Sequence, residues 1–445
     1  MQKTAAVILA AGKGTRMKSK LPKILHTVCN KPMIERVLNS VANAEIERSI
    51  VVVGFEGDKI KTALADKKFE SMQFEFADQT EQLGTGHAVM QTEQALKNFD
   101  GTVLILCGDT PLLKSETLKK FVDEHNSKNS SASVMTMEIP NPTGYGRIIR
   151  SADGSFEKIV EEKDADDEQK KIHEVNSGIY CFDSKKLFDA LKKITNDNVQ
   201  KEYYLPDTLE ILKSEGEKIS CVTIENPDET RGINSRQQLT DAEKIMYRWK
   251  IDELMDSGVT ISDPNSTFID PEVEIGMDTI ILPNAFIEGN SKIGEDCIIG
   301  PFVQIQNAVV ENSVKMGPFV HLRPGTVIKN QVKIGNFVEV KNSVIGIGSK
   351  LPHLQYIGDT DMGSNVNVGC GTVTCNYDGK KKYRTTIGDD VFIGCNTNLV
   401  APVEIENGAY LAAGGTITKN VPSKNLAIAR SRQINFDNWV DKRDQ

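Results

Sequence analysis

A glycine-rich loop, Leu-Ala-Ala-Gly-Lys-Gly-Thr-Arg-Met at residues 9–17, follows the first apolar segment of the chain. Its small residues, together with the cations Arg16 and Lys23, can lay backbone N–H groups and two positive charges along a triphosphate. The loop is not a dinucleotide fingerprint, because Met17 stands where a third glycine is needed, and it lacks the Gly-Lys-Ser/Thr end of a P-loop. Read alone, it is equally well explained as a tight turn with solvated charges.

A second candidate centre lies in the last quarter of the chain. His353, one of six histidines, falls in segment 349–356, and segment 376–384 holds the densest cluster of cations in the C-terminal half. Acyl transfer to an amine needs a base near neutral pH, because an ammonium cannot attack a thioester until it loses a proton. A single loop histidine is more often a bystander, and a lysine run is more often a solvated surface. Neighbouring motifs must therefore decide whether His353 has a catalytic role.

The apolar pattern of the first 110 residues places the glycine-rich loop at the edge of a sheet. Residues 5–10, 50–53 and 103–106 are short apolar runs, and residues 33–41 carry apolar side chains at helical spacing. Such alternation is typical of a parallel sheet covered on both faces, whose ligands bind at the carboxyl ends of the strands. The loop and Asp109 both fall at that edge. The first run resembles a short secretory leader, but it leads directly into the loop, so we expect a buried strand.

From residue 275 an aliphatic residue recurs at every sixth position in two runs, and glycine often follows it. The period is that of hexapeptide repeats, which form a parallel β-helix with three repeats in each triangular coil and the aliphatic side chain inside. Insertions in such a solenoid form loops at corners, so the breaks at 349–356 and 376–384 indicate segments with a role besides packing. The repeated positions are Ile275, Ile281, Ile287, Ile293, Ile299 and Ile305, then Ile387, Ile393, Leu399, Ile405, Leu411 and Ile417.

These patterns divide the 445-residue chain into two domains and a connector. We expect a doubly wound α/β domain over 1–229, a linker over 230–260 with one long helix between Asn234 and Ser257, and a left-handed parallel β-helix with a tail over 261–445. A net charge of −9 argues against general nucleic-acid or membrane binding, and no apolar stretch approaches the ~18 residues of a membrane span. Eight cysteines without a C-x-x-C pair fit free thiols in a reducing cytoplasm.

The loop at 9–17, with Leu-Pro-Lys at 21–23, resembles the sugar-phosphate nucleotidylyltransferases. Further matching motifs lie at residues 82–88, 108–109, 144–147, 160–163, 176–178 and 232–234. With the hexapeptide half, nearly the whole chain resembles the bacterial bifunctional family of N-acetylglucosamine-1-phosphate uridylyltransferases and glucosamine-1-phosphate acetyltransferases. The resemblance implies acetylation of glucosamine 1-phosphate from acetyl-CoA, followed by transfer of UMP from UTP with Mg²⁺. The product would be UDP-N-acetylglucosamine, a precursor of wall polymers.

The uridylyl-transfer site implied by the family has to bring together a sugar phosphate and a nucleoside triphosphate. Both are polyanions, so their charge must be neutralised. Mg²⁺ needs only one or two protein oxygens when phosphates supply others, and Asp109 with Asn234 meets that need. Arg16 and Lys23 would hold the β- and γ-phosphates and the leaving pyrophosphate. Cys107 stands where the family usually has Tyr, which puts that contact with the nucleotide in doubt. By resemblance, Leu9, Ala10 and Gly12 contact the nucleotide, Gln79, Gly84 and Thr85 select uracil, and Gly146, Glu161 and Asn176 hold the N-acetylglucosamine part.

The second site is implied by motifs at 323–325, 337–341 and 365–369, which resemble the acceptor-site motifs of the family. Carried over, His353 is the general base of acetyl transfer. Cys370 and Cys395 occupy places where the family often has Ala and Ser, so we expect packing changes without lost chemistry. The remaining residues implied are Arg323, Lys341, Tyr356, Asn367 and Lys382 for the amino sugar and its phosphate, Asn376 and Tyr377 beside the thioester, and Cys370, Cys395, Ala413 and Arg430 along CoA.

The family also implies a homotrimer with acetyl sites between subunits, and the tail after Asn420 would reach a neighbour. An alternative keeps the β-helix as an oligomerisation or regulatory module of an enzyme with nucleotidyl transfer alone. His353 and the residues at 376–377 distinguish this alternative from the two-site enzyme, since a β-helix that serves only for oligomerisation or regulation would not need them. A non-catalytic scaffold is opposed by the joint presence of Asp109, Arg16 and Lys23.

Overall fold

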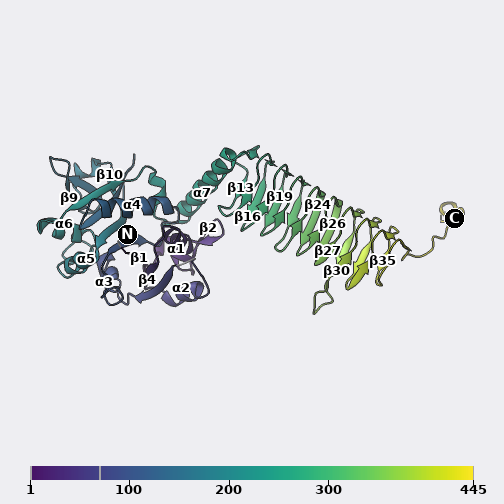
Figure 1. Ribbon diagram of the computed structural model, residues 1–445, viewed down its shortest axis with the longest axis horizontal. Coiled ribbons are helices and arrows are strands. Elements are labelled where there is room, and N and C mark those ends of the chain that lie inside the picture. Colours follow the sequence, from purple (N-terminus) through teal and green to yellow (C-terminus); the bar gives the residue numbers. More distant parts are fainter. Residues whose placement is uncertain (1–2, 70–71, 444–445) are drawn as a thin grey trace. The chain divides into compact units, whose positions relative to one another are not determined.

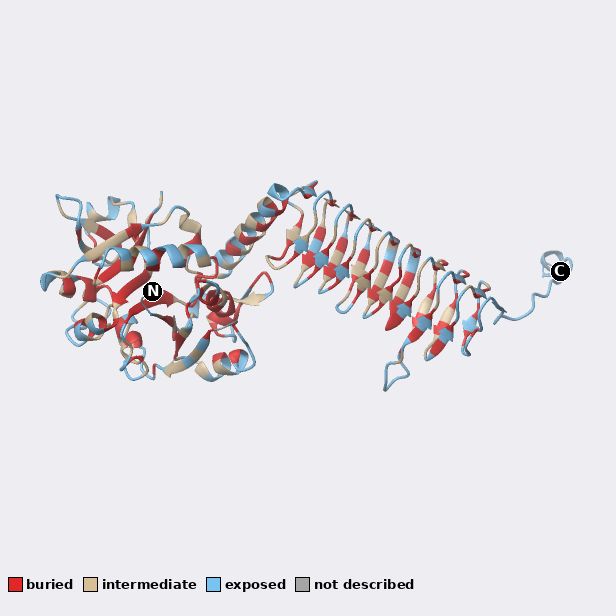
Figure 2. Cartoon of the chain, viewed as in Figure 1, coloured by how far each residue is buried: buried red, intermediate tan, exposed pale blue. Residues whose placement is uncertain are grey.

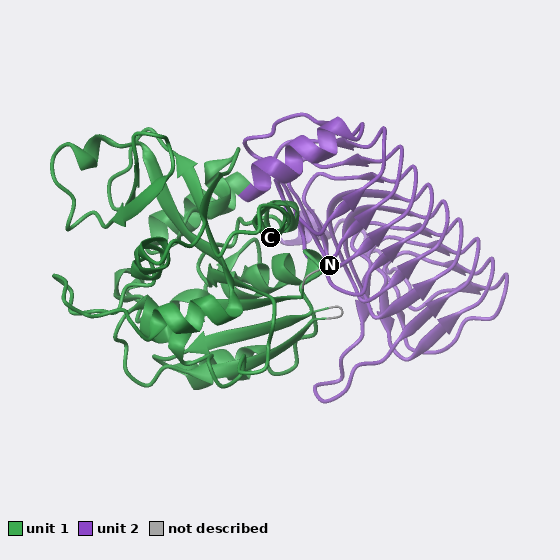
Figure 3. Cartoon of the chain, turned by 60° about the vertical axis from the view of Figure 1, so that its left-hand side comes forward, with its two compact units in different colours: residues 1–245 green, residues 246–445 purple. Residues whose placement is uncertain are grey.

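The structure, a computed structural model that describes residues 3–69 and 72–443, has two compact units, residues 1–245 and 246–445 (Figure 3). The division falls inside α7 (Arg236–Asp256), so this helix contributes to both units. A single long helix therefore lies between Asn234 and Ser257, where the sequence predicted one. Within the described part of the chain, no helix is long and apolar enough to cross a membrane.

Unit 1 is built on a mixed sheet whose strands lie in the order β11-β7-β10-β6-β1-β4-β5 (Figure 1). The central strand β1 (Thr4–Ala10) pairs in parallel with β4 (Arg48–Val53) and β6 (Thr102–Cys107), and β5 (Gln73–Asp78) extends this set beyond β4. The three apolar runs are therefore strands, as predicted. Because they are parallel, their carboxyl ends share one edge of the sheet.

The predicted parallel sheet contains one antiparallel strand, β10, in its main strand order. β10 (Glu174–Asp183) runs antiparallel to β6 and to β7 (Ala132–Glu138), while β11 (Ile219–Thr223) is parallel to β7. A parallel connection needs a crossover, usually a helix. Residues 161–173, all described, contain only the short 3-10 helix η3 (Gln169–Lys171), so the chain enters β10 directly from the hairpin of β8 (Arg147–Arg150) and β9 (Phe156–Val160).

Helices cover both faces of this sheet, as predicted. Alternate residues of β1 point to opposite sides, so Ala6 and Ile8 belong to one core cluster and Ala5 and Val7 to the other. The first cluster packs under α1 (Met33–Asn43), α2 (Gly57–Leu64) and α4 (Ser115–Ser127), and the second under α3 (Thr85–Met90), α5 (Ser184–Leu191) and α6 (Asp207–Ser214).

Unit 2 is a parallel β-helix, and the aliphatic repeat lines its interior. Ile281 pairs with Ile299, three hexapeptides further along the chain, so each coil of this region takes three repeats. Of the predicted positions, Ile275 is half-buried and all the others are buried, which confirms the repeat. Figure 2 shows the buried residues recurring from coil to coil.

The strands of unit 2 form three faces, here called A, B and C, and two long strands, β24 (Lys333–Lys341) and β26 (Lys350–Gly358), turn the corner from A to B. Face A has β12 (Thr260–Ile261), β15 (Ile280–Ile281), β18 (Ile298–Ile299), β21 (Lys315–Met316), β28 (Asn367–Val368), β31 (Phe392–Ile393), β34 (Tyr410–Leu411) and β36 (Leu426–Ala427). Face B has β13 (Phe268–Ile269), β16 (Ala285–Glu288), β19 (Val303–Gln306), β22 (Val320–Leu322), β29 (Val373–Cys375), β32 (Asn398–Val400) and β35 (Thr416–Ile417). Face C has β14 (Glu274–Ile275), β17 (Lys292–Ile293), β20 (Val309–Val310), β23 (Val327–Ile328), β25 (Val344–Ile345), β27 (Thr360–Met362), β30 (Thr385–Ile387) and β33 (Val403–Ile405).

The first break in the repeat is not the loop that the sequence predicted. Residues 350–358 form β26, which pairs with β24 from Lys333↔Lys350 to Lys341↔Gly358. Leu354 has a φ of 45°, and this left-handed residue lies where the strand turns from face A to face B. The coil from Lys333 to Lys350 is one residue shorter than three hexapeptides, but the buried Ile345, Leu351 and Ile357 keep a spacing of six, so the missing residue falls earlier, between Val340 and Ile345.

The second break is an extra loop, as predicted. Thr360 of β27 pairs with Thr385 of β30 across a coil that is longer than its neighbours, and the added residues project from the corner between faces B and C (Figure 1). Tyr377 and Lys382 form an antiparallel bridge within this loop. The tail beyond β36 leaves the repeat, since residues 428–443 are exposed and include only the short helix α8 (Trp439–Arg443).

Candidate active sites

Three predicted side chains meet at the carboxyl edge of the parallel strands in unit 1. Lys23, the first residue of the 3-10 helix η2 (Lys23–Leu25), forms an ion pair with Asp109, and its Nζ donates a hydrogen bond to Asn234 Oδ1 at 3.0 Å. The side chains of Lys23 and Asp109 are only 13% and 16% exposed. Asp109 follows β6 and Asn234 precedes α7. Three distant parts of the chain thus place two side-chain oxygens around the ammonium group of Lys23.

This donor set fits Mg²⁺. A carboxylate and an amide oxygen converge on the same ammonium, and both are hard ligands of the kind that Mg²⁺ prefers. Among the described residues, no group of three or more His, Cys, Asp or Glu side chains is arranged to hold a metal. An ion at Asp109 and Asn234 would therefore need further ligands, which the phosphates of a nucleotide and water can supply.

The glycine-rich loop makes room for this arrangement. Gly14 has a φ of 57°, and a Cβ at this residue would lie 2.6 Å from Lys23 Cβ, so a side chain here would push Lys23 away. The space around Gly12 is open, with no heavy atom within 4 Å of a Cβ built there. Leu9 and Ala10 end β1, and Arg16 lies exposed on the 3-10 helix η1 (Thr15–Met17). The loop thus presents its backbone beside Lys23, and both of its cations, Lys13 and Arg16, are exposed.

Gln79, Gly84 and Thr85 form a second group beyond β5. The buried Gln79 donates from Nε2 to Gly84 O at 3.1 Å and lies 3.1 Å from His87 Nδ1. Gly84 has a φ of 107°, and a Cβ would come within 2.7 Å of Tyr203 O, so this position requires glycine. Thr85 Oγ1 accepts from the backbone N–H of Leu205 at 3.1 Å. These contacts fix the three residues that the family resemblance assigns to the base.

The third group in unit 1 lies where the β8–β9 hairpin joins β10. The N–H of Asn176 donates to Gly146 O at 2.8 Å, and its side-chain Nδ2 donates to Tyr180 Oη at 2.7 Å. A Cβ on Gly146 would stand 3.2 Å from Glu161 Oε1, so glycine leaves space for that carboxylate. Burial raises the pKa of Glu161, and the nearby charge of Asp164 raises it further. Gly146, Glu161 and Asn176 are therefore brought together as predicted.

Cys107, at the end of β6, forms part of the wall near the metal candidates. Burial raises the pKa of its thiol to about 12, with the charge of Asp109 adding to the effect and that of Lys23 opposing it. The side chain is thus a neutral thiol at physiological pH, unable to act as a thiolate ligand or nucleophile.

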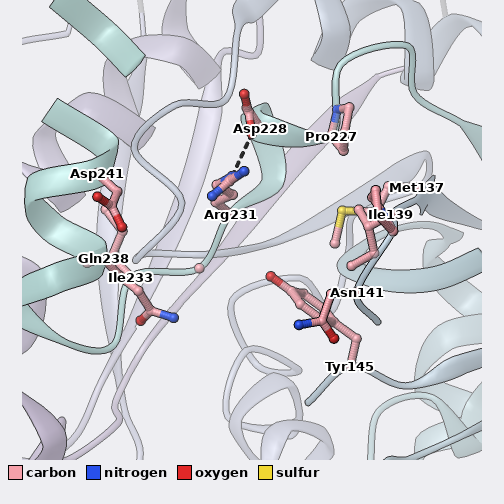
Figure 4. A pocket seen from close by; sticks show the side chains of 12 residues that line it. Met137, Ile139, Asn141, Tyr145, Pro227, Asp228, Arg231, Ile233, Gln238 and Asp241 are labelled. Atoms are coloured by element: carbon pink, nitrogen blue, oxygen red, sulfur yellow. Dashed lines mark hydrogen bonds and ion pairs between the residues drawn. The ribbon is translucent and has the colours of Figure 1, made fainter. Parts of the chain in front are cut away.

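A pocket of about 460 Å³ in unit 1 is lined mostly by residues outside the motifs that the sequence analysis singled out (Figure 4). Arg231 forms an ion pair with Asp228 at 2.6 Å on one wall, and Tyr145 lies on another. Burial raises the pKa of Tyr145, and the charge of Asp109 contributes to the rise. Gly232 lines the pocket and lies beside Asp109, since a Cβ there would be 3.9 Å from Asp109 Oδ1. The pocket therefore adjoins the metal candidates, and the motifs at 144–147 and 232–234 were the available signal for it.

On unit 2, four of the predicted acceptor residues lie near the corner of faces B and C. Lys341 ends β24, and Arg323, which follows β22 on the preceding coil, forms an ion pair with Glu339 at 2.9 Å. The neighbouring Lys341 ammonium lowers the pKa of Lys382, which comes from the inserted loop. Tyr356 folds over Gly358, where a Cβ would meet its hydroxyl at 2.5 Å. Two adjacent ammonium groups make this corner a candidate anion site.

His353 lies elsewhere on unit 2, at the corner of faces A and B. Its Nδ1 is 2.8 Å from Oδ1 of Asn336, the residue paired with it on β24. An amide oxygen only accepts, so Nδ1 carries the hydrogen and Nε2 keeps its lone pair in the neutral ring. Asn367 lies on face A, where it pairs with Lys350 and Phe392. Within one chain, none of the contacts found among the described residues joins His353 or Asn367 to the Lys341–Lys382 corner.

The residues assigned to CoA follow the same corner of faces A and B into later coils. Cys370, Cys395 and Ala413 occupy equivalent places, each three residues after the strand positions Asn367, Phe392 and Tyr410 that pair with one another. A Cβ on Gly414 would lie 3.9 Å from Arg430 Cδ, which extends the column by one more residue. In the inserted loop, Asn376 is buried and Tyr377 is exposed. The four residues assigned to CoA thus form a column along successive coils.

Comparisons with known proteins agree with both halves of this arrangement. The nucleotidyl transferase family matches residues 5–227, and the bacterial transferase hexapeptide family of six repeats matches residues 272–307 and 384–419. The bifunctional protein GlmU of Caldanaerobacter subterraneus is 52% identical over 100% of this chain and 99% of its own length. The chain belongs to the GlmU family. The GlmU proteins of a Geobacillus species and of Acetivibrio thermocellus are each 50% identical, over 99% and 100% of this chain and 98% of their own lengths. Family membership thus extends across both units.

Asn336 is a contact of His353 that the sequence reasoning missed. It immediately precedes the motif at 337–341, but its link to His353 depends on the shortened coil that brings residues 336 and 353 opposite each other. A reading in strict hexapeptides puts them out of register.

Proposed function

We propose that the chain is a two-site transferase that makes UDP-N-acetylglucosamine. Unit 2 would acetylate glucosamine 1-phosphate from acetyl-CoA, and unit 1 would transfer UMP from UTP to N-acetylglucosamine 1-phosphate and release pyrophosphate. Full-length membership in a family of proteins named bifunctional supports both activities. The observation that carries the proposal is the convergence of Lys23, Asp109 and Asn234 in one unit, while the other holds a separate pair of cations beside an inserted loop.

In uridylyl transfer, a phosphate oxygen of the sugar attacks the α-phosphorus of UTP as the bond to the β-phosphate oxygen breaks. Lys23 and Arg16 hold the β- and γ-phosphates and the departing pyrophosphate. Asp109 and Asn234 would hold Mg²⁺, which would supply charge neutralisation. The nucleotide lies against Leu9, Ala10 and Gly12, uracil lies against Gln79, Gly84 and Thr85, and the sugar lies against Gly146, Glu161 and Asn176.

In acetyl transfer, Nε2 of His353 accepts a proton from the amino group of the sugar, whose nitrogen attacks the thioester carbon. The carbon–sulfur bond then breaks, and CoA leaves as its thiolate. Asn376 and Tyr377 flank the thioester, and CoA runs along Cys370, Cys395, Ala413 and Arg430. The acceptor is held by Arg323, Lys341, Tyr356, Asn367 and Lys382.

A homotrimer would complete this second site. His353 and Asn367 lie at or on face A and the lysine pair lies by face B, so packing face A of one copy against face B of the next would join them. An exposed apolar ridge at the corner of these faces supports such an association. Phe302, Phe319 and Phe337 stack there at centroid distances of 5.1 and 5.0 Å, each about half exposed. The tail with Arg430 would reach a neighbouring copy.

We test the assembly by light scattering on wild type and on Phe319→Arg, with Val309→Arg on face C as the matched control. The trimer should persist in the control and dissociate in Phe319→Arg. A trimer in both variants would remove the ridge from the interface. We place the enzyme in the cytoplasm, where acetyl-CoA and UTP are available and unpaired thiols persist.

Separate assays of the two reactions test the proposed function. His353→Ala should lose acetyl transfer and keep uridylyl transfer, and Asp109→Ala should do the reverse. The alternative, a nucleotidyl transferase with an inert β-helix, predicts no acetyl transfer by any variant. Loss of both activities in either folded variant would refute the independence of the sites.

A further inference from the structure

A buried carboxylate underlies the corner of faces B and C, and no role assigned above uses it. Asp359 is only 5% exposed and connects β26 to β27. Its φ of 49° is left-handed, a conformation that Asp and Asn accept more readily than most residues. Burying a charge is costly unless it is paired and hydrogen-bonded, so an ionised Asp359 depends on its partners.

Both oxygens of Asp359 are engaged by residues from neighbouring coils. Oδ1 accepts from Asn342 Nδ2 at 2.5 Å. Oδ2 accepts from Asn376 Nδ2 and lies 3.7 Å from Lys341 Nζ. Lys341 and Asn342 belong to the preceding coil, and Asn376 begins the inserted loop of the following one. One carboxylate therefore links the proposed acceptor lysine to the loop that flanks the thioester.

The charge of Asp359 is also coupled to Lys382. Burial by itself would raise the pKa of Asp359, but the hydrogen bonds from Asn342 and Asn376 and the charges of Lys341 and Lys382 outweigh burial and lower it. Asp359 is thus ionised at neutral pH. In return, Asp359 raises the pKa of Lys382, as Tyr356 also does, against the lowering by Lys341.

We propose that Asp359 is a positioning residue for acetyl transfer, which holds Asn376 on the donor side and the Lys341 ammonium on the acceptor side through the same carboxylate. The inference rests on the proposed function. An asparagine at 359 would fill the same space, but it lacks the charge and the second acceptor oxygen. Asn342 and Asn376 both donate N–H groups, so one of them would then face another donor and lose its place.

The test compares Asp359→Asn with Asp361→Asn as matched control. Asp361 lies two residues away, is half exposed and pairs with Arg384, and none of the contacts found for its carboxylate among the described residues is to Lys341, Asn342 or Asn376. We expect the acetyl-transfer kcat of Asp359→Asn to fall about 10- to 100-fold, because small displacements of positioned groups cost rates of this order. The KM for glucosamine 1-phosphate should change less than about threefold at neutral pH. Asp361→Asn should match wild type in both constants.

A pH series separates positioning from general damage to the fold. Removing the charge at 359 lowers the pKa of Lys382, so the alkaline rise in KM for glucosamine 1-phosphate should move to lower pH in Asp359→Asn. Asp359→Glu keeps the charge but displaces it, so its KM profile should stay in place while kcat falls. If Asp359→Asn fails to fold, the loss of kcat in Asp359→Glu tests the positioning role by itself. Uridylyl transfer by the same samples reports whether the protein is intact.

The outcomes distinguish this inference from the proposed function. An active wild type with Asp359→Asn and Asp359→Glu indistinguishable from Asp361→Asn would overturn the inference and leave acetyl transfer standing. A folded wild type without acetyl transfer would overturn the proposed function, and the inference would fall with it.

Discussion

Replacing Lys23 with methionine should tighten the binding of a divalent metal to the nucleotide-free protein. The ammonium of Lys23 contacts Asp109 and Asn234, the two residues proposed to bind Mg²⁺. A metal that enters without nucleotide has to displace this ammonium. Methionine has a similar length and no charge, so it leaves the two oxygens without that competitor.

The magnitude follows from the surroundings of the pair. Both side chains are less than one-fifth exposed, so water screens their interaction only in part. A hydrogen bond to a charged group contributes about 1.5–3 kcal/mol. If the metal no longer has to break it, the dissociation constant should fall about 10- to 100-fold.

Titration with Mn²⁺, followed by electron paramagnetic resonance without nucleotide, measures this change directly. Asp109→Asn should abolish the site, and Lys61→Met should bind as wild type, because Lys61 pairs at 2.7 Å with the exposed Asp78. Uridylyl transfer by Lys23→Met should nevertheless fall about 10²- to 10³-fold, since a donor to the phosphates is lost. Equal or weaker Mn²⁺ binding by Lys23→Met would refute the competition.

Three further predictions concern other parts of the chain. Asn336→Ala should lower acetyl transfer about fivefold in a steady-state assay and spare uridylyl transfer, because one orienting hydrogen bond of about 1 kcal/mol is lost. A thiol reagent at mildly alkaline pH should label the exposed Cys395 quickly and Cys107, which is less exposed and has its pKa raised to about 12, far more slowly in the folded protein; equally rapid labelling of both would contradict this difference. Leu399→Ala should lower the free energy of unfolding by about 2–5 kcal/mol in a urea titration, while Val309→Ala on the surface should change it far less.

The features that the sequence predicted well depend on local periodicity or on one rule of sheet geometry. The aliphatic residues of the β-helix are inside because the repeat itself fixes which side chain points inward. Lys23, Asp109 and Asn234 converge because loops after parallel strands share an edge. In these cases a short segment contains most of the information.

The features that the sequence did not predict depend on register between distant segments. β10 is antiparallel because a hairpin, and not a crossover helix, precedes it, and the apolar pattern of a strand does not encode its direction. His353 is on a strand and not in a loop because residues 350–358 pair continuously with β24 around the corner of faces A and B, which the apolar pattern does not show. Asp359 went unnoticed because its importance comes from Asn342 and Asn376, which only the stacking of successive coils brings to it.

The most direct test of the account asks whether the β-helix is a second active site. Loss of the acetyl-CoA thioester would be followed with purified wild type and with His353→Ala, each with and without glucosamine 1-phosphate. The account predicts loss in wild type that requires the sugar phosphate and disappears in the variant. No loss with a folded wild type, or undiminished loss with His353→Ala, would contradict it.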